Sequence, residues 1–142
     1  MQEIKAPKKL EILIGDDGFL EPVTMIIFKE DYAQKLKREL SGYEINIAYE
    51  TNPQRVIEKG SRYDVIVTDL DYTGDGTGKQ GYDVIDAISK LNPRPLIILC
   101  TSSDNHEEIQ EKTQGKIDYL AGTGQGHKFG DLIDVLIGHY GS

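Results

Sequence analysis

Residues 63–71, with the sequence YDVIVTDLD, decide the fold that we expect for this chain. Val65, Ile66 and Val67 form a continuous apolar run, which is typical of a strand that other elements cover on both faces. Strands of that kind belong to parallel sheets. Asp69 and Asp71 follow directly, so the stretch predicts a buried parallel strand that ends in acidic side chains.

Apolar runs and segments with helical spacing alternate along the rest of the chain. This alternation predicts an α/β fold, a five-stranded parallel sheet with helices on both faces, joined by right-handed crossovers. We expect one domain over residues 1–142, with residues 1–8 as a flexible tail. The predicted strands are residues 10–14, 44–49, 63–68, 95–100 and 117–121, and the predicted helices are residues 28–40, 52–60, 82–91, 105–114 and 129–139.

Length and charge exclude several classes of protein. A chain of 142 residues has the size of one domain. Its 16 basic and 24 acidic residues give a formal net charge of −8, which repels nucleic-acid phosphates and anionic lipid, so we expect neither nucleic acid nor membrane as a partner. The N-terminal residues lack the apolar centre of a signal peptide, and a single cysteine cannot form an internal disulfide. We therefore expect a cytoplasmic protein.

Acidic side chains follow two of the predicted strands. Asp16 and Asp17 come after the first strand, and Asp69 comes after the third. Ligands of open parallel sheets bind beyond the carboxyl ends of the strands, and these residues converge there if the two strands are neighbours. Three carboxylates so close repel one another unless a cation lies among them, and oxygen ligands of this kind suit Mg²⁺. The sequence therefore predicts a magnesium site.

The order of these motifs resembles that of the receiver domain of response regulators, the CheY-like family. Asp16 and Asp17 match the acidic pair that binds the metal ion in this family, and Asp69 matches the aspartate that accepts a phosphoryl group. Thr101 matches the hydroxyl residue after the fourth strand, and Tyr119 matches the aromatic switch position. The resemblance extends from about residue 10 to residue 140.

The resemblance implies a flavodoxin-like sheet in the order 2-1-3-4-5. It implies Mg²⁺ held by Asp16, Asp17 and Asp69 together with the backbone carbonyl of Asp71. It also implies a signalling domain rather than an enzyme, which receives a phosphoryl group on Asp69 from a histidine kinase or phosphotransfer protein. No output domain follows in the sequence given, so we expect it to act through contact with a downstream protein, or to be one domain of a longer chain.

Three stretches depart from the family pattern. The family carries Lys and then Pro after the fifth strand, where this chain has Gly122 and Thr123, so Lys128 or Lys79 would have to supply the positive charge. The segment after the acidic pair is long, and we expect residues 19–23 to form an extra loop. Residues 72–81 are longer than the family's loop after the phosphoacceptor and lack its usual Pro.

Two alternatives remain open at this point. A pseudo-receiver would dock onto partners without phosphorylation. Asp69 and Asp71 also fit the nucleophile and general acid of haloacid-dehalogenase-type phosphatases, with Thr101 binding the phosphate. Asp131 and Asp134 would then be that enzyme's late acidic pair, but those enzymes place the nucleophile strand first, and both residues lie in a predicted helix.

Overall fold

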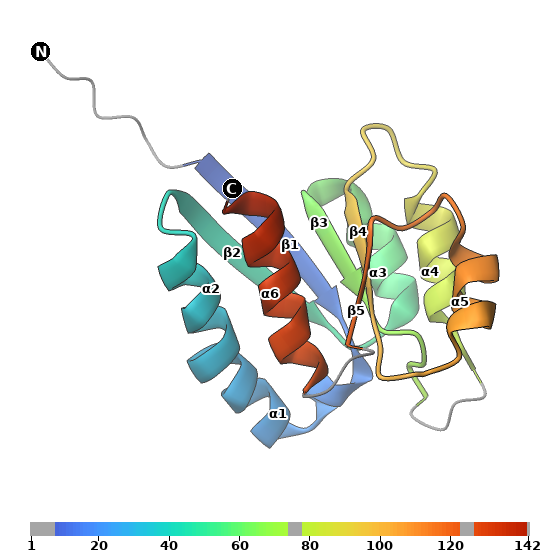
Figure 1. The fold of residues 1–142 in the computed structure, drawn as a ribbon, viewed down its shortest axis with the longest axis horizontal. Helices are drawn as coiled ribbons and strands as arrows, with labels where there is room; N and C mark the ends of the chain where they lie inside the picture. The colour runs from blue at the N-terminus through green and yellow to red at the C-terminus, as the bar shows by residue number, and fades with distance from the viewer. Residues whose placement is uncertain (1–7, 74–77, 123–126, 142) are drawn as a thin grey trace, which may run out of the picture.

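The fold is a single parallel sheet with helices on both faces, in a computed structural model that describes residues 8–73, 78–122 and 127–141. The strands lie in the order β2-β1-β3-β4-β5 and all neighbouring pairs are parallel. Figure 1 shows this arrangement, which confirms the predicted fold class and strand order. The strands are β1 (Lys8–Gly15), β2 (Tyr43–Glu50), β3 (Val65–Thr68), β4 (Leu96–Cys100) and β5 (Tyr119–Ala121).

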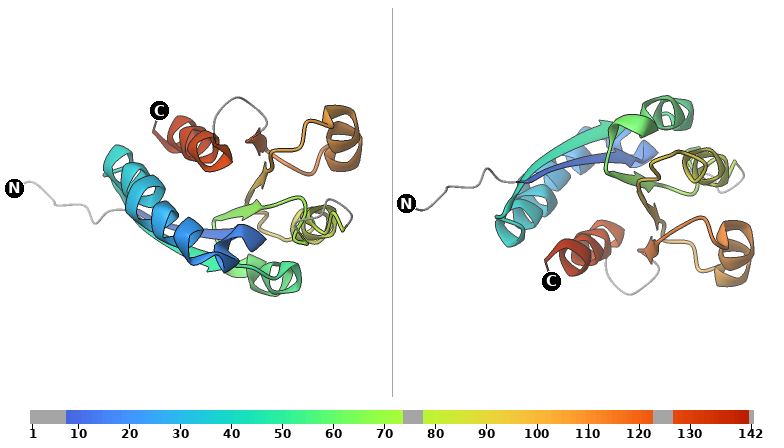
Figure 2. Two further views of the ribbon diagram at one scale, coloured as in Figure 1. Left: turned by 90° about the horizontal axis from the view of Figure 1, so that it is seen from below. Right: turned by 90° about the horizontal axis from the view of Figure 1, so that it is seen from above.

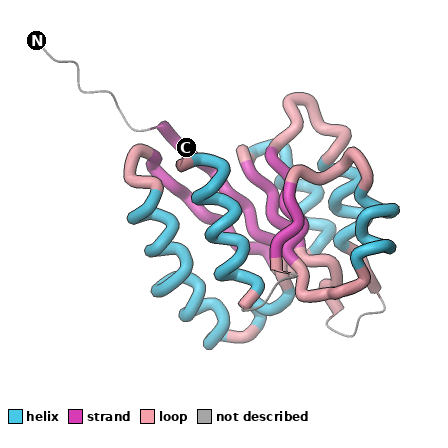
Figure 3. The backbone as a smooth tube through the Cα atoms, viewed as in Figure 1, coloured by secondary structure: helices cyan, strands magenta, loops and turns pink. Residues whose placement is uncertain are grey.

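Helices connect the strands and form two layers around the sheet (Figures 2 and 3). Helices α2 and α6 share one hydrophobic cluster with the sheet, and α3, α4 and α5 share the other. In the described ranges no helix is long and apolar enough to cross a membrane. The helices are α1 (Pro22–Ile27), α2 (Ala33–Glu39), α3 (Pro53–Lys59), α4 (Gly81–Ile88), α5 (His106–Thr113) and α6 (Lys128–Tyr140), with short helical segments η1 (Asp17–Leu20), η2 (Phe28–Tyr32) and η3 (Gly60–Arg62).

Strand β3 lies at the centre of the sheet because its side chains pack into the hydrophobic clusters on both faces. Val65 and Val67 pack into the cluster with α2 and α6, while Ile66 packs into the cluster with α3, α4 and α5. Successive side chains of a strand point to opposite faces, so a continuous apolar run fills both cores. All three side chains are at most 1% exposed. The apolar run that predicted this strand is therefore its packing surface.

The start of α3 follows local rules that the sequence displays. The Asn52 side chain accepts a hydrogen bond from the backbone N–H of Gln54 at 2.8 Å, and Pro53 occupies the first helical position. Both features stabilise a helix N-terminus, because the side chain satisfies a backbone donor and proline has no N–H to leave unpaired. The predicted helix start at residue 52 is confirmed to within one residue.

The extra loop expected over residues 19–23 is wrong. The chain forms η1 over Asp17–Leu20, and α1 begins at Pro22 and continues through the π-helical segment η2 into α2. Helix α1 has no buried residue, and Val23 and Ile26 are more than half exposed. Met25 packs partly buried against the core, but a helix with so little buried surface lacks the apolar periodicity on which the prediction depended. The added residues therefore lengthen the first helix.

Other predictions fall partly on undescribed residues. The expected tail over residues 1–8 lies outside the described residues, except for Lys8, which begins β1. Residues 74–77 of the long loop after Asp69, and residues 123–126 after Gly122, are also outside them.

Gly81, at the start of α4, lies against the backbone that carries Asp69. Its N–H donates to the carbonyl of Leu70 at 2.8 Å, and an added Cβ would lie 2.6 Å from the Cα of Leu70 and clash with the carbonyl oxygen of Asp69. Backbone atoms cannot move aside as a flexible side chain can. We expect Gly81→Ala to lower the free energy of unfolding by about 1–3 kcal/mol, measured by urea denaturation.

Gly138→Ala is the matched control for this prediction. Gly138 is exposed in α6 and an added Cβ there meets no atom within 4 Å. Because alanine has a higher helix propensity than glycine, the free energy of unfolding of this variant should rise by up to about 1 kcal/mol. Equal stability of Gly81→Ala and the unaltered protein would show that the close approach to Asp69 is absent.

Candidate functional site

Three carboxylates meet at the carboxyl ends of β1 and β3. The backbone N–H of Asp69 donates to the carbonyl of Gly15 at 2.8 Å, which ties the ends of the two neighbouring strands together. One carboxylate oxygen from each of Asp16, Asp17 and Asp69 lies within 4.8 Å of the others. The structure therefore brings together the three residues that the sequence predicted to converge.

Local hydrogen bonds fix two of the carboxylates. One oxygen of Asp16 accepts from the N–H of Gly18 at 2.8 Å and caps η1, while the residue is only 2% exposed. One oxygen of Asp69 accepts from the N–H of Leu70 at 2.8 Å. In each residue the second oxygen faces the same cation, Lys128. The carboxylates are thus oriented before any ligand binds.

Burial, together with crowding of negative charge, shifts the pKa values of this cluster. Burial and the neighbouring Asp16 carboxylate raise the pKa of Asp69 to about 7, although Lys128 acts in the opposite direction. Burial and Asp16 also raise the pKa of Asp17. Both shifts have the sign expected when acidic groups share a site that lacks enough positive charge. A bound cation would relieve this repulsion.

The donor set fits a small hard cation. Each of the three residues offers a carboxylate oxygen, and Mg²⁺ is bound in proteins by a few carboxylates and several waters. The Asp71 carboxylate instead accepts hydrogen bonds from the N–H and hydroxyl of Thr73, at 3.0 and 2.7 Å. A contribution from the Asp71 backbone carbonyl stays a prediction.

Lys128 places a positive charge next to the acidic cluster, where the sequence predicted either Lys128 or Lys79. Its ammonium group lies 2.6 Å from a carboxylate oxygen of Asp16 and 3.7 Å from one of Asp69. Burial disfavours its charge, but the two carboxylates outweigh burial and raise the pKa of Lys128. Lys79, the other candidate, pairs with Glu108 at 2.7 Å instead. Of the two lysines, Lys128 is the one that the structure places in the acidic site.

Thr101 lies just after β4, and Tyr119 lies at the start of β5. Thr101 follows β4, is 5% exposed, and its hydroxyl accepts from the N–H of Ser103 at 3.2 Å. Tyr119 begins β5 and is 36% exposed, with its hydroxyl 2.8 Å from Nδ1 of His139 in α6. Thr101 is thus at the same edge of the sheet as the carboxylates, while Tyr119 contacts the outer face of α6. Their roles in a switch stay predictions.

The residues of the phosphatase alternative do not join the acidic site. Asp131 accepts a hydrogen bond from the N–H of Gly122 at 2.6 Å, and Asp134 pairs with Lys35 at 3.5 Å on the surface. Both lie in α6, and among the described residues the carboxylate cluster contains neither of them. The late acidic pair of that reading is therefore absent from the cluster.

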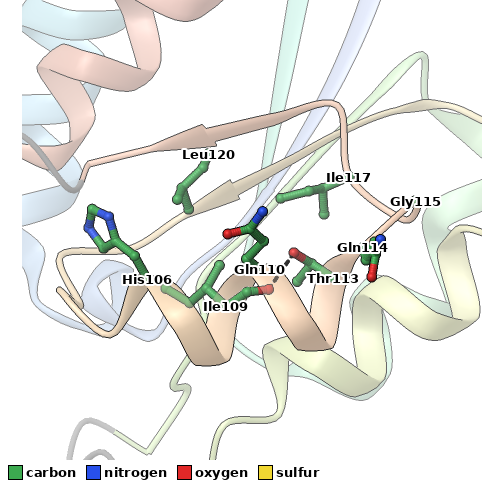
Figure 4. Close-up of a pocket in the computed structure, with 8 residues that line it drawn as sticks. All are labelled: His106, Ile109, Gln110, Thr113, Gln114, Gly115, Ile117 and Leu120. Atoms are coloured by element: carbon green, nitrogen blue, oxygen red, sulfur yellow. Dashed lines mark hydrogen bonds between the residues drawn. The ribbon is translucent and has the colours of Figure 1, made fainter.

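A separate cavity of about 350 Å³ lies between α5 and β5 (Figure 4). Ile109, Ile117 and Leu120 contribute apolar side chains to its lining, and the amide of Gln110 lies among them. None of the three clustered aspartates lines it, so the cavity is distinct from the acidic site. It is lined by His106, Ile109, Gln110, Thr113, Gln114, Gly115, Ile117 and Leu120.

Asp17 allows a direct test of the charge crowding. It does not cap η1, since Asp16 does, so Asp17→Asn removes a like charge without removing a cap. We expect metal-free Asp17→Asn to be more stable by about 0.5–1 kcal/mol, a modest gain because Asp17 is partly exposed. We also expect Mg²⁺ to stabilise it less than it stabilises the unaltered protein. Urea denaturation with and without Mg²⁺ measures both effects.

Asp31→Asn makes the same change of net charge at an exposed position of η2. It should leave the response to Mg²⁺ unchanged. A loss of metal-free stability in Asp17→Asn, with none in Asp31→Asn, would show that Asp17 has a structural role instead.

Comparison with known proteins identifies the fold of this chain. No family model matches the sequence, and no curated protein matches it. The receiver domain of the putative response regulator NarL from Mycobacterium tuberculosis is similar in structure, with 15% identity, a TM-score of 0.59, and 96% of this chain and 99% of that chain covered. The receiver domain of an HD domain-containing protein from Pseudomonas fluorescens Pf-5 has 14% identity and a TM-score of 0.61, with 99% and 96% covered.

The isolated receiver domain of RcsB from Salmonella enterica serovar Typhimurium, in the presence of the phosphomimetic BeF3⁻, is also similar. It has 20% identity and a TM-score of 0.56, with 80% of this chain and 76% of that chain covered. The chain therefore has the flavodoxin-like fold of response-regulator receiver domains. This confirms the fold that the resemblance implied.

Proposed function

We propose that this chain is a phosphoacceptor signalling domain in which Asp69 receives a phosphoryl group. The observation that carries the proposal is the cluster at the sheet edge, where Asp69 follows the central strand and faces two further carboxylates and Lys128. An Asp69 oxygen attacks the phosphorus of a phosphohistidine, the P–N bond breaks, and the histidine nitrogen keeps the electron pair. The product is an acyl phosphate on Asp69.

The surrounding residues have distinct roles in this proposal. Asp16, Asp17 and Asp69 would hold Mg²⁺, which supplies positive charge next to the phosphoryl oxygens when it is bound. The Thr101 hydroxyl, at the end of the neighbouring strand, donates a hydrogen bond to the phosphoryl group. The cation and the Thr101 hydroxyl would together replace part of the hydration of the incoming negative charge.

The proposed partners are proteins. A histidine kinase or phosphotransfer protein in the cytoplasm donates the phosphoryl group, and a downstream protein binds the face around Tyr119. Movement of Thr101 toward the phosphoryl group would alter that face, because the N–H of Thr101 bonds the carbonyl of Ala121 in β5 at 2.9 Å. Tyr119 begins the same strand, so this backbone connection links the site to the switch residue.

Incubation with Mg²⁺ and acetyl phosphate tests this function. We expect one phosphoryl adduct per chain by intact-mass measurement, and no continuous release of phosphate from a phosphate monoester such as p-nitrophenyl phosphate. Sustained release of phosphate would support the phosphatase alternative. Absence of both adduct and release would support docking without phosphorylation.

A further inference from the structure

A phosphoryl group on Asp69 would require a positive charge that this fold does not deliver from the end of β5. The group adds about −1.5 to −2 charges to a site that already holds three carboxylates. Within the described ranges, Lys128 is the cation that pairs with Asp16 and Asp69. Lys128 is the first residue of α6, so its position depends on how that helix begins.

The absence of a side chain at Gly122 leaves room for Lys128. Gly122 follows β5 with a φ of 93°, a conformation that favours glycine. An added Cβ would lie 2.7 Å from the Cβ of Lys128 and 2.7 Å from the carbonyl oxygen of Thr101. A side chain at position 122 would therefore clash with Lys128 in its observed position. A lysine at position 122, as in the family pattern, would not fit this backbone.

Asp131 connects this glycine to the helix that carries the lysine. It lies in the first turn of α6, three residues after Lys128, and its carboxylate accepts from the N–H of Gly122 at 2.6 Å. A charge-assisted hydrogen bond of this kind is short and strong. It joins the end of β5 directly to the helix turn that presents Lys128.

Contacts on the other side of Lys128 complete the arrangement. The Phe129 ring stacks on Phe19, two residues after Asp17, with 5.4 Å between ring centroids and 5° between planes. The thiol of Cys100 contacts the carbonyl oxygen of Lys128 at 3.6 Å. The first turn of α6 is thus held against η1, β4 and the end of β5.

We propose that Asp131 is a positioning residue for this site: by bonding Gly122 it fixes the first turn of α6, so that Lys128 reaches the carboxylates and the phosphoryl group from a helix rather than from a strand end. This inference rests on the proposed function for the role of the phosphoryl group. The placement of Lys128 by Asp131 is independent of it and is measured separately.

The first test measures the exposure of Lys128 in Asp131→Ala by competitive labelling of amines with acetic anhydride, read by peptide mass. In the unaltered protein Lys128 should react much more slowly than the exposed Lys112. Asp131→Ala should raise its relative reactivity about tenfold or more, and Asp131→Asn, which keeps an acceptor oxygen, should restore most of the protection.

Asp83→Ala is the matched control, because Asp83 lies exposed in the first turn of α4 and its loss changes net charge and helix-end electrostatics in the same way. It should leave Lys128 protected. Equal protection of Lys128 in Asp131→Ala and Asp83→Ala would overturn the proposal. If Asp131→Ala does not fold, Asp131→Leu, which has a similar side-chain size and no acceptor oxygen, takes its place: raised reactivity of Lys128 in the folded variant supports the proposal, and unchanged protection contradicts it.

The second test follows the rate of adduct formation from acetyl phosphate. Asp131→Ala and Lys128→Met should each slow it by about 10- to 100-fold, the worth of one charge-assisted hydrogen bond. The double variant should be no slower than Lys128→Met, since Asp131 acts through Lys128. Additive losses would contradict the positioning role. If the unaltered protein forms no adduct, the proposed function fails, while the labelling result still decides the placement of Lys128.

Discussion

Replacement of Asp69 by asparagine should abolish the phosphoryl adduct completely. Asp69 is the clustered carboxylate that leaves the central strand β3, opposite Asp16 and Asp17 and within 3.7 Å of Lys128. An amide oxygen is a far weaker nucleophile than a carboxylate, and the product would not be an acyl phosphate. Intact-mass measurement after reaction with acetyl phosphate and Mg²⁺ should therefore show no adduct.

Asp71→Asn is the control for this prediction. Asp71 lies two residues further along, and its carboxylate bonds the N–H and hydroxyl of Thr73. We expect this variant to keep the adduct. Persistence of the adduct in Asp69→Asn, or its loss in Asp71→Asn alone, would assign the acceptor to another residue and favour a different chemistry for this edge of the sheet.

The second large effect is a dependence of metal-free stability on pH. Burial and Asp16 raise the pKa of folded Asp69 from 3.8 to about 7, so between these pH values the folded state binds a proton that the unfolded state has lost. The resulting contribution to stability is complete below about pH 4 and is lost as pH rises through 7. At 1.36 kcal/mol per pKa unit its upper limit is about 4 kcal/mol.

Comparison with Asp69→Asn isolates this contribution, because the variant lacks the titrating group. The two proteins should have similar free energies of unfolding near pH 4, and the variant should be more stable by about 2–4 kcal/mol at pH 8 in the absence of metal. Saturating Mg²⁺ should reduce the difference, since it stabilises the ionised cluster. A pH-independent difference between the two proteins would show that Asp69 is ionised without penalty in the folded state.

The sheet could be predicted from the sequence because its buried strands consist largely of apolar residues. Val65, Ile66 and Val67 are apolar in succession and fill two hydrophobic clusters, so the run itself indicates a central strand. Helix α1 was not predicted, because it is largely exposed. None of its side chains is fully buried, although Met25 packs partly buried against the core, and the sequence contains no clear periodic signal for it. A segment shows a regular pattern of apolar residues only where it packs against the core.

The acidic site was also predictable, because topology alone brings the ends of neighbouring parallel strands together. Asp16, Asp17 and Asp69 needed only the order of the strands to converge. The choice between Lys128 and Lys79 was not predictable in this way. In the structure Lys128 reaches the site beside a turn at Gly122, whose N–H donates to the Asp131 carboxylate, and neither feature has a periodicity or motif of its own.

Localisation of the phosphoryl group within the chain tests the central claim most directly. The unaltered protein is allowed to react with acetyl phosphate and Mg²⁺, the acyl phosphate is trapped by borohydride reduction, and the modified residue is identified by peptide mass spectrometry. We predict a single modified residue, Asp69, at the end of β3. A modification at any other residue, or none in a protein that binds Mg²⁺ at the acidic cluster, would contradict the account.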